Sequence, residues 1–286
     1  LVERLREETR ALCIVNTKKI AQELYKEMRG EGVYHLSTSM YPKHRKKVLE
    51  VIRKRLDDEE KCIVISTSLV EAGVDLDFTS VYRQIAGVDS LIQSAGRCNR
   101  NGKESPEKSN VYIFDFEDER VPLGQKMQIE VAKSVLQDYG QVDDIEGITD
   151  YFQRLYHYRG DSLDKKHIMD EFEKMRYNFA KVGKEFKLIE QDTKTVFIHN
   201  ESEAENLLNE LRLKGVSKER MREAGQYCVQ IYGNEREENS YFYKLYSMGM
   251  LRLISEDIQD FYELVTQNQY SEEYGLDYEI DDALIW

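Results

Sequence analysis

A decapeptide with two arginines at fixed spacing is the part of this sequence best suited to chemistry. It reads Gln-Ser-Ala-Gly-Arg-Cys-Asn-Arg-Asn-Gly, beginning at Gln93 and containing Arg97 and Arg100. On a helix, a spacing of three would place both arginines on one face, where they could converge on one anion. Arginine suits this task because it is always charged and donates two parallel hydrogen bonds to phosphate oxygens. A solvated basic helix end is the alternative interpretation.

A second polar segment lies upstream of this decapeptide. The apolar run Cys62–Ile65 leads into Ser66-Thr67-Ser68, and Glu-Ala-Gly-Val-Asp follows, ending at Asp75. A buried strand that ends in hydroxyl side chains is where open α/β sheets contact phosphates. The alternative is that the hydroxyls merely end the strand and Asp75 begins a turn. The spacing between the two segments favours a function for both.

Together these segments resemble motifs V and VI of superfamily 2 helicases. The run Ser-Leu-Val-Glu-Ala-Gly-Val-Asp-Leu-Asp, followed by Gln-Ser-Ala-Gly-Arg-Cys-Asn-Arg-Asn-Gly, is most similar to the CRISPR-associated helicase-nuclease of type I interference. The resemblance implies an enzyme that uses ATP to move along single-stranded DNA and unwind it, while its nuclease degrades invading DNA. Single-stranded DNA and the CRISPR surveillance complex (Cascade) would then be partners.

The resemblance also implies roles for individual residues around ATP. Arg97 and Arg100 would reach the γ-phosphate, and Gln93 would lie near the triphosphate or the attacking water. Such an arginine can raise turnover by ~10³–10⁵-fold, because phosphoryl transfer is catalysed mainly by positioning and charge neutralisation. Gly73 and Asp75 match the nucleotide-facing end of motif V, with Asp75 near the ribose or an arginine. For Gln93, an ordinary surface amide is an equally good interpretation.

Two pairs of hydroxyl residues are candidates for nucleic-acid contact. Thr67 and Ser68 match motif V positions that hydrogen-bond the nucleic-acid backbone. Ser37 and Thr38, which precede the basic run 43–47, resemble the block between motifs IV and V. Hydroxyls and a helix N-terminus offer donors to phosphate oxygens, and lysines add salt-sensitive affinity. A solvated basic helix face accounts for the lysines equally well.

The sequence lacks two motifs that a complete ATP site needs. It contains no G-x-x-x-x-G-K-[ST] phosphate loop and no D-E-x-H metal motif. The resemblance therefore implies that ATP and Mg²⁺ are bound mainly by a first RecA-like lobe of the same polypeptide, which would also carry the nuclease domain. We expect the chain, which begins at Leu1, to be a fragment that is inactive alone. Its five histidines have no metal-ligand spacing, so we predict no metal site.

Charge is distributed unevenly along the chain. Residues 1–120 carry 21 Lys and Arg against 21 Asp and Glu, so the rest carries the whole net charge of −13. The helicase-like part therefore repels a polyanion less than the total suggests. The acidic part is better suited to covering or docking than to serving as the main DNA surface.

Cysteine spacing and hydropathy suggest a compartment. The four cysteines show no Cys-x-x-Cys spacing, which argues against a disulfide framework or a zinc site and predicts a reducing cytoplasm. No run of 18 apolar residues is present, so we expect no contact with a membrane.

The order of apolar segments predicts an α/β fold. Strand patterns alternate with helix patterns up to Asp115, which indicates a RecA-like parallel sheet with helices on both faces. We predict a second RecA-like lobe over 1–118, a helical linker over 119–183 and a small α+β C-terminal domain over 184–286. The predicted strands are 11–16, 33–36, 62–66, 80–84 and 110–115, and the predicted helices are 18–28, 43–56, 89–98, 124–139, 144–157, 163–180 and 203–213. A hairpin is predicted over Lys184–Asn200.

Two further functions are compatible with these patterns. The lobe could belong to a superfamily 2 helicase that acts in RNA metabolism or repair. It could also be a non-catalytic module that docks other proteins through its acidic half.

Overall fold

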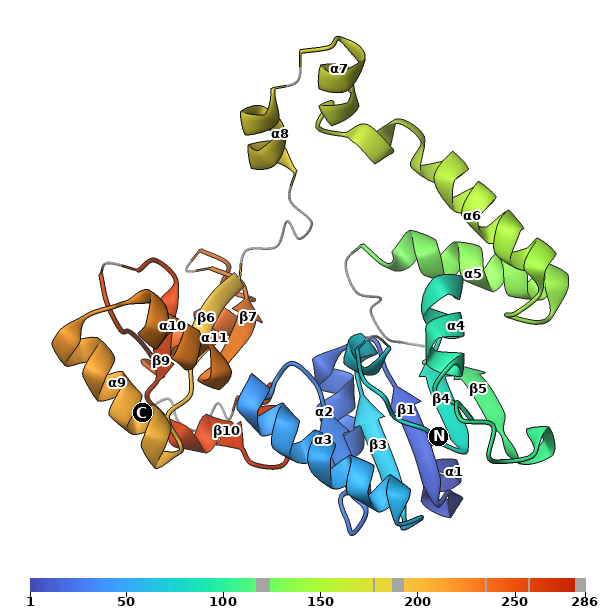
Figure 1. The fold of residues 1–286 in the computed structure, drawn as a ribbon, viewed down its shortest axis with the longest axis horizontal. Coiled ribbons are helices and arrows are strands. Elements are labelled where there is room, and N and C mark those ends of the chain that lie inside the picture. Colours follow the sequence, from blue (N-terminus) through green and yellow to red (C-terminus); the bar gives the residue numbers. More distant parts are fainter. Residues whose placement is uncertain are drawn as a thin grey trace. The chain divides into compact units, whose positions relative to one another are not determined.

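The computed structural model drawn in Figure 1 describes seven stretches of the chain. They are residues 1–71, 73–116, 124–176, 178–186, 193–234, 236–256 and 258–280. The chain forms two compact units. The first comprises Leu1–Ile85, Gln93–Arg120 and Asp192–Trp286, and the second comprises Ala86–Ile92 and Val121–Gln191. Within the described stretches, no helix is long and apolar enough to cross a membrane.

A five-stranded parallel sheet forms the first part of the first unit. Its strand order is β2-β3-β1-β4-β5, and all four pairings are parallel. The inner strands β1 and β3 are largely apolar because both of their faces are covered. The strands are β1 (Arg10–Ile14), β2 (Val33–Leu36), β3 (Cys62–Ser66), β4 (Ser80–Gln84) and β5 (Asn110–Phe114).

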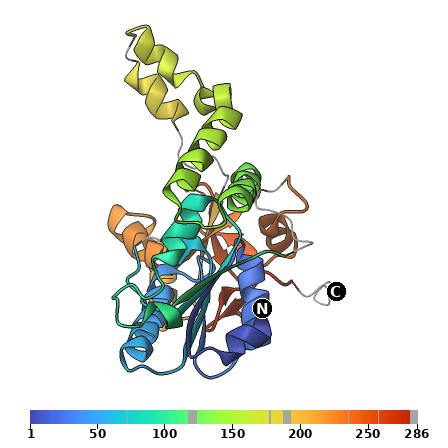
Figure 2. The same cartoon turned by 90° about the vertical axis from the view of Figure 1, so that its right-hand side faces the viewer.

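Helices cover both faces of this sheet. Along β1, Ala11 and Cys13 pack in one core cluster with α1 and α2, whereas Leu12 and Ile14 pack in another with α3. Figure 2 shows these blue helices on opposite sides of the strands. The helices are α1 (Val2–Glu7), α2 (Lys18–Met28) and α3 (Pro42–Asp57). The predicted RecA-like sheet is confirmed, and α2, β2, β3 and β4 have the predicted bounds.

The second unit contains several helices, and two of them pack together around a core of their own. Val131, Val135, Tyr151 and Leu155 pack against one another and against Val88. The helices are α5 (Lys126–Tyr139), α6 (Ile145–Arg159), η3 (Gly160–Asp164), α7 (Ile168–Glu173) and α8 (Phe179–Glu185). The amphipathic patterns therefore predicted α5 and α6 to within two residues at each end.

The single helix predicted over 163–180 is wrong. His167 and Met175 adopt φ angles of 52° and 49°, in the left-handed region that ends helices. The carboxylate of Asp164 then starts α7 by accepting hydrogen bonds from the N–H groups of Ile168 (2.7 Å) and Met169 (2.9 Å).

A small mixed sheet forms the C-terminal part of the first unit. Its order is β7-β6-β9-β8, with β6 antiparallel to β7 and parallel to β9. Both edges of β6 are thus occupied, so the predicted hairpin paired β6 with the wrong segment. That segment, 186–189, lies almost entirely outside the described residues. The elements are β6 (Thr193–Phe197), α9 (Ser202–Lys214), α10 (Lys218–Ala224), η4 (Gly225–Tyr227), β7 (Cys228–Tyr232), α11 (Tyr241–Ser247), β8 (Leu251–Leu253), β9 (Phe261–Leu264), η5 (Gln267–Gln269), β10 (Tyr270–Ser271) and β11 (Gly275–Leu276).

Residues 270–280, here called the C-terminal strap, return from this sheet to the parallel sheet. The Leu276 N–H donates to the Ser39 carbonyl at 2.8 Å, and the Ser39 hydroxyl donates to the Tyr274 carbonyl at 2.7 Å. The Gln22 amide of α2 donates to the carbonyls of Tyr274 (3.3 Å) and Leu276 (2.6 Å). The loop that follows β2 is therefore held by residues more than two hundred positions later in the chain.

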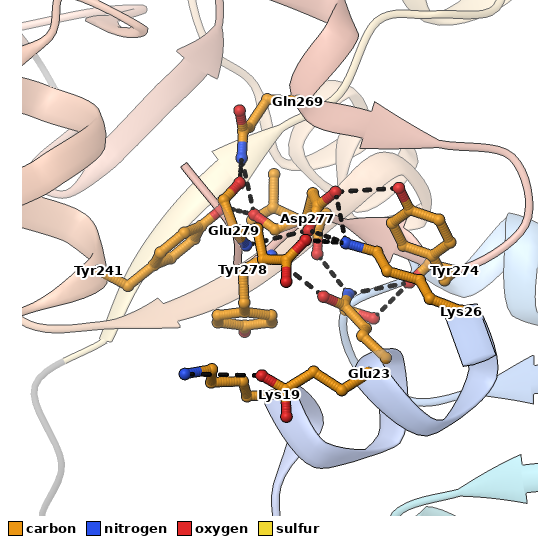
Figure 3. Close-up of polar contacts among 12 residues, drawn as sticks. Lys19, Glu23, Lys26, Tyr241, Gln269, Tyr274, Asp277, Tyr278 and Glu279 are labelled. Carbon is orange, nitrogen blue, oxygen red and sulfur yellow. Dashed lines mark hydrogen bonds and ion pairs between the residues drawn. The ribbon is translucent and has the colours of Figure 1, made fainter. Parts of the chain in front are cut away.

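Charged and aromatic contacts complete the attachment of the strap. Lys26 of α2 points toward Asp277 and Glu279, at 3.0 and 2.7 Å (Figure 3). The His44 Nε2–H donates to the Glu272 carbonyl at 2.8 Å, so its Nδ1 accepts from the Tyr270 hydroxyl at 2.7 Å. Burial lowers the pKa of His44, which is consistent with this neutral form.

Substitution of Gly275 tests the close approach of the strap. A Cβ there would lie 2.3 Å from the Ser39 carbonyl oxygen, whereas one at Gly249 would meet nothing within 4 Å. Both glycines have a positive φ, of 80° and 69°, so both substitutions carry that cost. We expect Gly275→Ala to lower the free energy of unfolding by about 1–3 kcal/mol more than Gly249→Ala. Urea denaturation followed by circular dichroism would measure this, and equal losses would contradict the close packing.

Candidate functional site

The loops that follow β1, β2 and β3 lie at one edge of the parallel sheet, and two of them carry predicted site residues. Asn16 follows β1, the residues around Thr38 follow β2, and Thr67 and Ser68 follow β3. These loops are neighbours because their strands are adjacent and parallel. The Ser66 hydroxyl donates to the Leu36 carbonyl at 2.6 Å and so links two of them. This edge is where open α/β sheets bind ligands.

Arg97 and Arg100 lie beyond the end of a helix and not on its face. Helix α4 spans Val88–Ala95 and so ends before either arginine. The predicted helix 89–98 therefore extended too far toward the C-terminus. After Ala95 the chain turns, and Asn99 adopts a φ of 46°. The two arginines are positioned by separate contacts, and helical spacing does not explain their placement.

The guanidinium of Arg97 is tethered to motif V. Its Nε donates to the Val70 carbonyl at 3.0 Å and its Nη2 donates to the Glu71 carbonyl at 2.6 Å. The residue is 7% exposed. Burial, together with the neighbouring charge of Arg100, lowers its pKa. Because the acceptors are main-chain atoms, these bonds fix the two motifs relative to each other.

Arg100 is the accessible member of the pair. Its Nε lies 2.9 Å from Asp75 Oδ1, and the side chains are 41% and 78% exposed. The Arg100 N–H donates to Asp77 Oδ1 at 2.7 Å, and the Asn101 N–H donates to Oδ2 at 3.3 Å. The ion pair with Asp75 is weak because it is exposed, so the Arg100 guanidinium remains available. Asp77 contacts the backbone and positions it. We expected Asp75 to lie near the ribose or an arginine, and the structure places it beside Arg100.

The other predicted site residues differ in accessibility. Gln93 and Ser68 are exposed, and Thr38 is half-buried. Gly73 is exposed with a φ of 74°. Thr67 is 9% exposed.

Ser37 is fully buried, and its hydroxyl is engaged within the protein. It lies 2.8 Å from His35 Nε2 and 2.6 Å from the Ser39 hydroxyl. Contact between Ser37 and DNA stays a prediction, and a phosphate could reach this hydroxyl only if the loop rearranged.

A cavity of about 490 Å³ lies between this edge and the C-terminal sheet. Lys18, Thr38 and Arg45 line it on one side, and Gln230 and Tyr232 on the other. Among the described residues, neither cation forms an ion pair with a carboxylate. The Lys18 ammonium instead lies 3.4 Å from the Gln230 carbonyl and 5.5 Å from the centre of the Tyr232 ring. The sequence analysis missed Lys18, whereas Arg45 belongs to the basic run 43–47 that it named.

Burial changes the ionisation of Lys18. Desolvation, followed by the nearby charge of Arg45, lowers the pKa of Lys18 to about 8. Burial also lowers the pKa of Arg45, whose Nη1 donates to the Met40 carbonyl at 2.6 Å. Two desolvated cations without an acidic partner favour an anionic ligand.

The structure brings together one potential set of metal ligands that the histidine spacing did not predict. Ligand atoms of Asp164, His167 and Asp170 lie within 4.8 Å of one another. Both oxygens of Asp164 already accept N–H groups at the start of α7. Helix capping therefore accounts for the cluster, and we assign no metal to it.

Comparison with known proteins shows a similarity to CRISPR-associated nuclease/helicases. Residues 7–103 match the family model for the CRISPR-associated nuclease/helicase Cas3, C-terminal. Cas3 of Methanothermobacter thermautotrophicus is 34% identical over an alignment of 142 positions, which covers 48% of this chain and 17% of that protein. Cas3 of Streptococcus thermophilus is 25% identical over an alignment of 281 positions, which covers 92% of this chain and 27% of that protein. Over these segments the chain is similar to Cas3 proteins.

Solved structures agree on the fold. The crystal structure of T. fusca Cas3 matches with a TM-score of 0.56 at 15% identity and covers 99% of this chain and 39% of that one. T. fusca Cas3 with AMPPNP matches with a TM-score of 0.55 at 14% identity, covering 92% of this chain and 36% of that one. A pre-nicking CRISPR RNA-guided surveillance complex matches with a TM-score of 0.54 at 14% identity, covering 96% of this chain and 42% of that one.

The chain is thus similar to the C-terminal region of Cas3, comprising helicase lobe 2 and the C-terminal domain. It spans less than a third of the length of the two curated Cas3 proteins described above.

The ionisation of Lys18 can be measured directly. We expect its Cε and Hε signals to titrate near pH 8, because burial disfavours the ammonium form. A two-dimensional NMR titration would measure this, with the Lys18→Arg variant used to assign the signal. Arg45→Met should raise the midpoint, since it removes a repelling charge. A Lys18 midpoint at the ordinary lysine value would contradict the desolvated cavity.

Proposed function

We propose that this chain is the second RecA-like lobe and C-terminal domain of an ATP-dependent single-stranded DNA helicase within a CRISPR helicase-nuclease. It would supply the arginine half of the ATP site and part of the DNA path. The observation that supports this best is the paired placement of Arg97 and Arg100, one tethered to motif V and the other accessible. We also propose the boundaries 1–118, 119–183 and 184–286 for the lobe, the linker and the C-terminal domain.

Arg100 is the stronger candidate for direct contact with the triphosphate. Its guanidinium is exposed and its only described carboxylate partner, Asp75, is itself exposed, so a phosphate could replace that partner at little cost. Arg97 would add a second charge beside it, and Gln93 would orient the attacking water. Gly73 would let the nucleotide approach the backbone.

The rest of the ATP site is assigned to another part of the polypeptide. Asp75 and Asp77, the carboxylates beside Arg100, are engaged by its side chain and by backbone N–H groups. The sequence contains no phosphate loop and no D-E-x-H motif, so we assign Mg²⁺ and most contacts with ATP to a first RecA-like lobe. The T. fusca Cas3 crystals with ATP and AMPPNP are consistent with ATP as the nucleotide.

The DNA path is proposed to follow the edge of the sheet and enter the cavity. Thr67, Ser68 and Thr38 would donate hydrogen bonds to phosphates, and Lys18 and Arg45 would supply positive charge there. A polyanion is the ligand class that two uncompensated cations in an otherwise acidic chain select. Ser37 would take part only after its loop rearranged.

A role in the surveillance complex is proposed for the acidic C-terminal domain. A surface with net negative charge gains nothing by lying openly along DNA, because like charges repel within ~8 Å at physiological salt. Its outward side is better suited to contact with protein partners. The pre-nicking surveillance complex with a similar fold supports Cascade as the partner to test.

Loss of either arginine should abolish ATP turnover in the full-length polypeptide. We expect Arg97→Ala or Arg100→Ala to lower DNA-stimulated turnover by at least ~10²-fold, because each removes charge neutralisation from phosphoryl transfer. Single-stranded DNA binding should stay within about threefold of the wild type, since neither arginine lines the cavity. Phosphate-release kinetics and DNA titration would measure the two effects.

The exposed Arg236 serves as the matched control, and Arg236→Ala should leave turnover unchanged. Only Arg97→Ala should also lower the unfolding midpoint, because Arg97 is the buried one of these three arginines. Retention of turnover in both arginine variants would refute the proposed ATP site.

Removal of the cavity cations should weaken DNA binding. We expect Lys18→Met and Arg45→Met each to lower single-stranded DNA affinity by about 10-fold and the salt slope by ~0.7, as for one lost phosphate contact. Wild-type affinity should fall as the pH rises through about 8, where free Lys18 loses its proton. Lys18→Arg should remove this pH dependence while keeping affinity.

Fluorescence anisotropy at several salt concentrations would measure these affinities. Lys54→Met is the matched control, because Lys54 is exposed in the last turn of α3. If the Lys18, Arg45 and Lys54 variants all bound DNA equally well, the cavity would not be part of the path.

A further inference from the structure

A buried ion pair includes Glu71, one of the two residues whose backbone carbonyls bind Arg97. Arg83 Nη2 of β4 is 3.1 Å from Glu71 Oε1, and the two side chains are only 3% and 8% exposed. The Ser94 hydroxyl of α4 donates to the same carboxylate oxygen at 3.2 Å. Burying two charges carries a desolvation penalty that a well-packed apolar pair would avoid. Stability alone therefore gives no reason to place this pair here.

Glu71 links the pair to the tethered arginine. Its carboxylate binds Arg83, while its own backbone carbonyl accepts the Arg97 Nη2–H at 2.6 Å. A displacement of the carboxylate would move the peptide group that holds Arg97. The side chain of Arg83 thus acts on Arg97 through a single residue.

Arg83 also reaches the loop on the DNA side of the sheet. Its Nη1 donates to Asn16 Oδ1 at 2.7 Å and to the Gln84 carbonyl at 2.8 Å. The Asn16 N–H in turn donates to Gln84 Oε1 at 2.8 Å. Asn16 lies two residues before Lys18, one of the cavity cations. One guanidinium therefore contacts the loop after β1 and, through Glu71, the arginine of motif VI.

We propose that Arg83, paired with Glu71, is a positioning residue that links DNA occupancy beside Asn16 to the placement of Arg97. DNA bound along the loop after β1 would hold Asn16 in place. The Arg83 guanidinium, which contacts both Asn16 and Glu71, would then hold Glu71 and hence Arg97 in place. Neither member of the pair touches the nucleotide. This inference rests on the proposed function, and it concerns how DNA stimulates ATP turnover.

A paired apolar replacement separates positioning from stability. In the full-length polypeptide, Glu71→Leu combined with Arg83→Met removes both charges at similar volume, so the fold should be kept. The single Glu71→Gln variant keeps the shape and an acceptor for Ser94 but removes the charge. ATP turnover would be measured with and without single-stranded DNA, together with the KM for ATP and the urea unfolding midpoint.

We expect both variants to keep basal turnover and the KM for ATP within about threefold, while stimulation by DNA falls by at least ~10-fold. The double variant should unfold at the wild-type urea concentration or above it. A purely structural pair would give the opposite result, since stimulation would recover together with stability in the double variant.

The matched control is the Lys194–Asp260 pair of the C-terminal sheet, 2.6 Å apart. Lys194→Met with Asp260→Asn should leave DNA stimulation unchanged. If Arg100→Ala abolished turnover while the Glu71 and Arg83 variants kept full stimulation, only this inference would be wrong. If Arg100→Ala left turnover intact, the proposed ATP site itself would be wrong.

Discussion

The tether between the Arg97 guanidinium and the backbone carbonyls of Val70 and Glu71 is the contact on which the candidate site depends. Carbonyl groups have no rotamers, so bonds to them fix the path of the main chain. A buried guanidinium that lost these acceptors would bear the full cost of desolvation. The turn after β3 and the segment after α4 therefore have one preferred relative position, from which Arg100 extends into solvent.

The parallel sheet provides the frame for this tether. Parallel strands end at a common edge, so segments far apart in the sequence become neighbours without special contacts. The C-terminal strap then holds one of these segments from outside, through Ser39 and His44. Several of its ion pairs are exposed, such as Arg29–Glu273 at 64% and 38%, and contribute little. Its backbone hydrogen bonds and the close approach of Gly275 contribute more.

Electrostatics distinguishes the cavity from the rest of an acidic chain. The net charge of −13 arises from the second part of the sequence, yet the residues of that part that line the cavity, such as Gln230 and Tyr232, are all uncharged. Among the described residues, no carboxylate therefore forms an ion pair with Lys18 or Arg45. Burial strengthens the field of these cations and also makes Lys18 easier to deprotonate. Affinity for an anion and sensitivity to alkaline pH thus have the same cause.

The sequence by itself determined the sheet, most of its helices and the identity of the motif residues. Short apolar runs rich in β-branched residues favour buried strands. Helical periodicity marked α2 and α3, and the order of two motifs indicated a helicase lobe. Only the tertiary structure decided where the two arginines lie, because Asn99 turns the chain after α4 ends. It also corrected the hairpin, since β9 takes the edge of β6. Lys18 had no local signal and Arg45 was one member of the basic run 43–47, because a cation becomes a binding residue only when distant segments bury it. Lys18 meets its partner Gln230 across 212 positions of sequence, and no pattern within a helix or a strand encodes that contact.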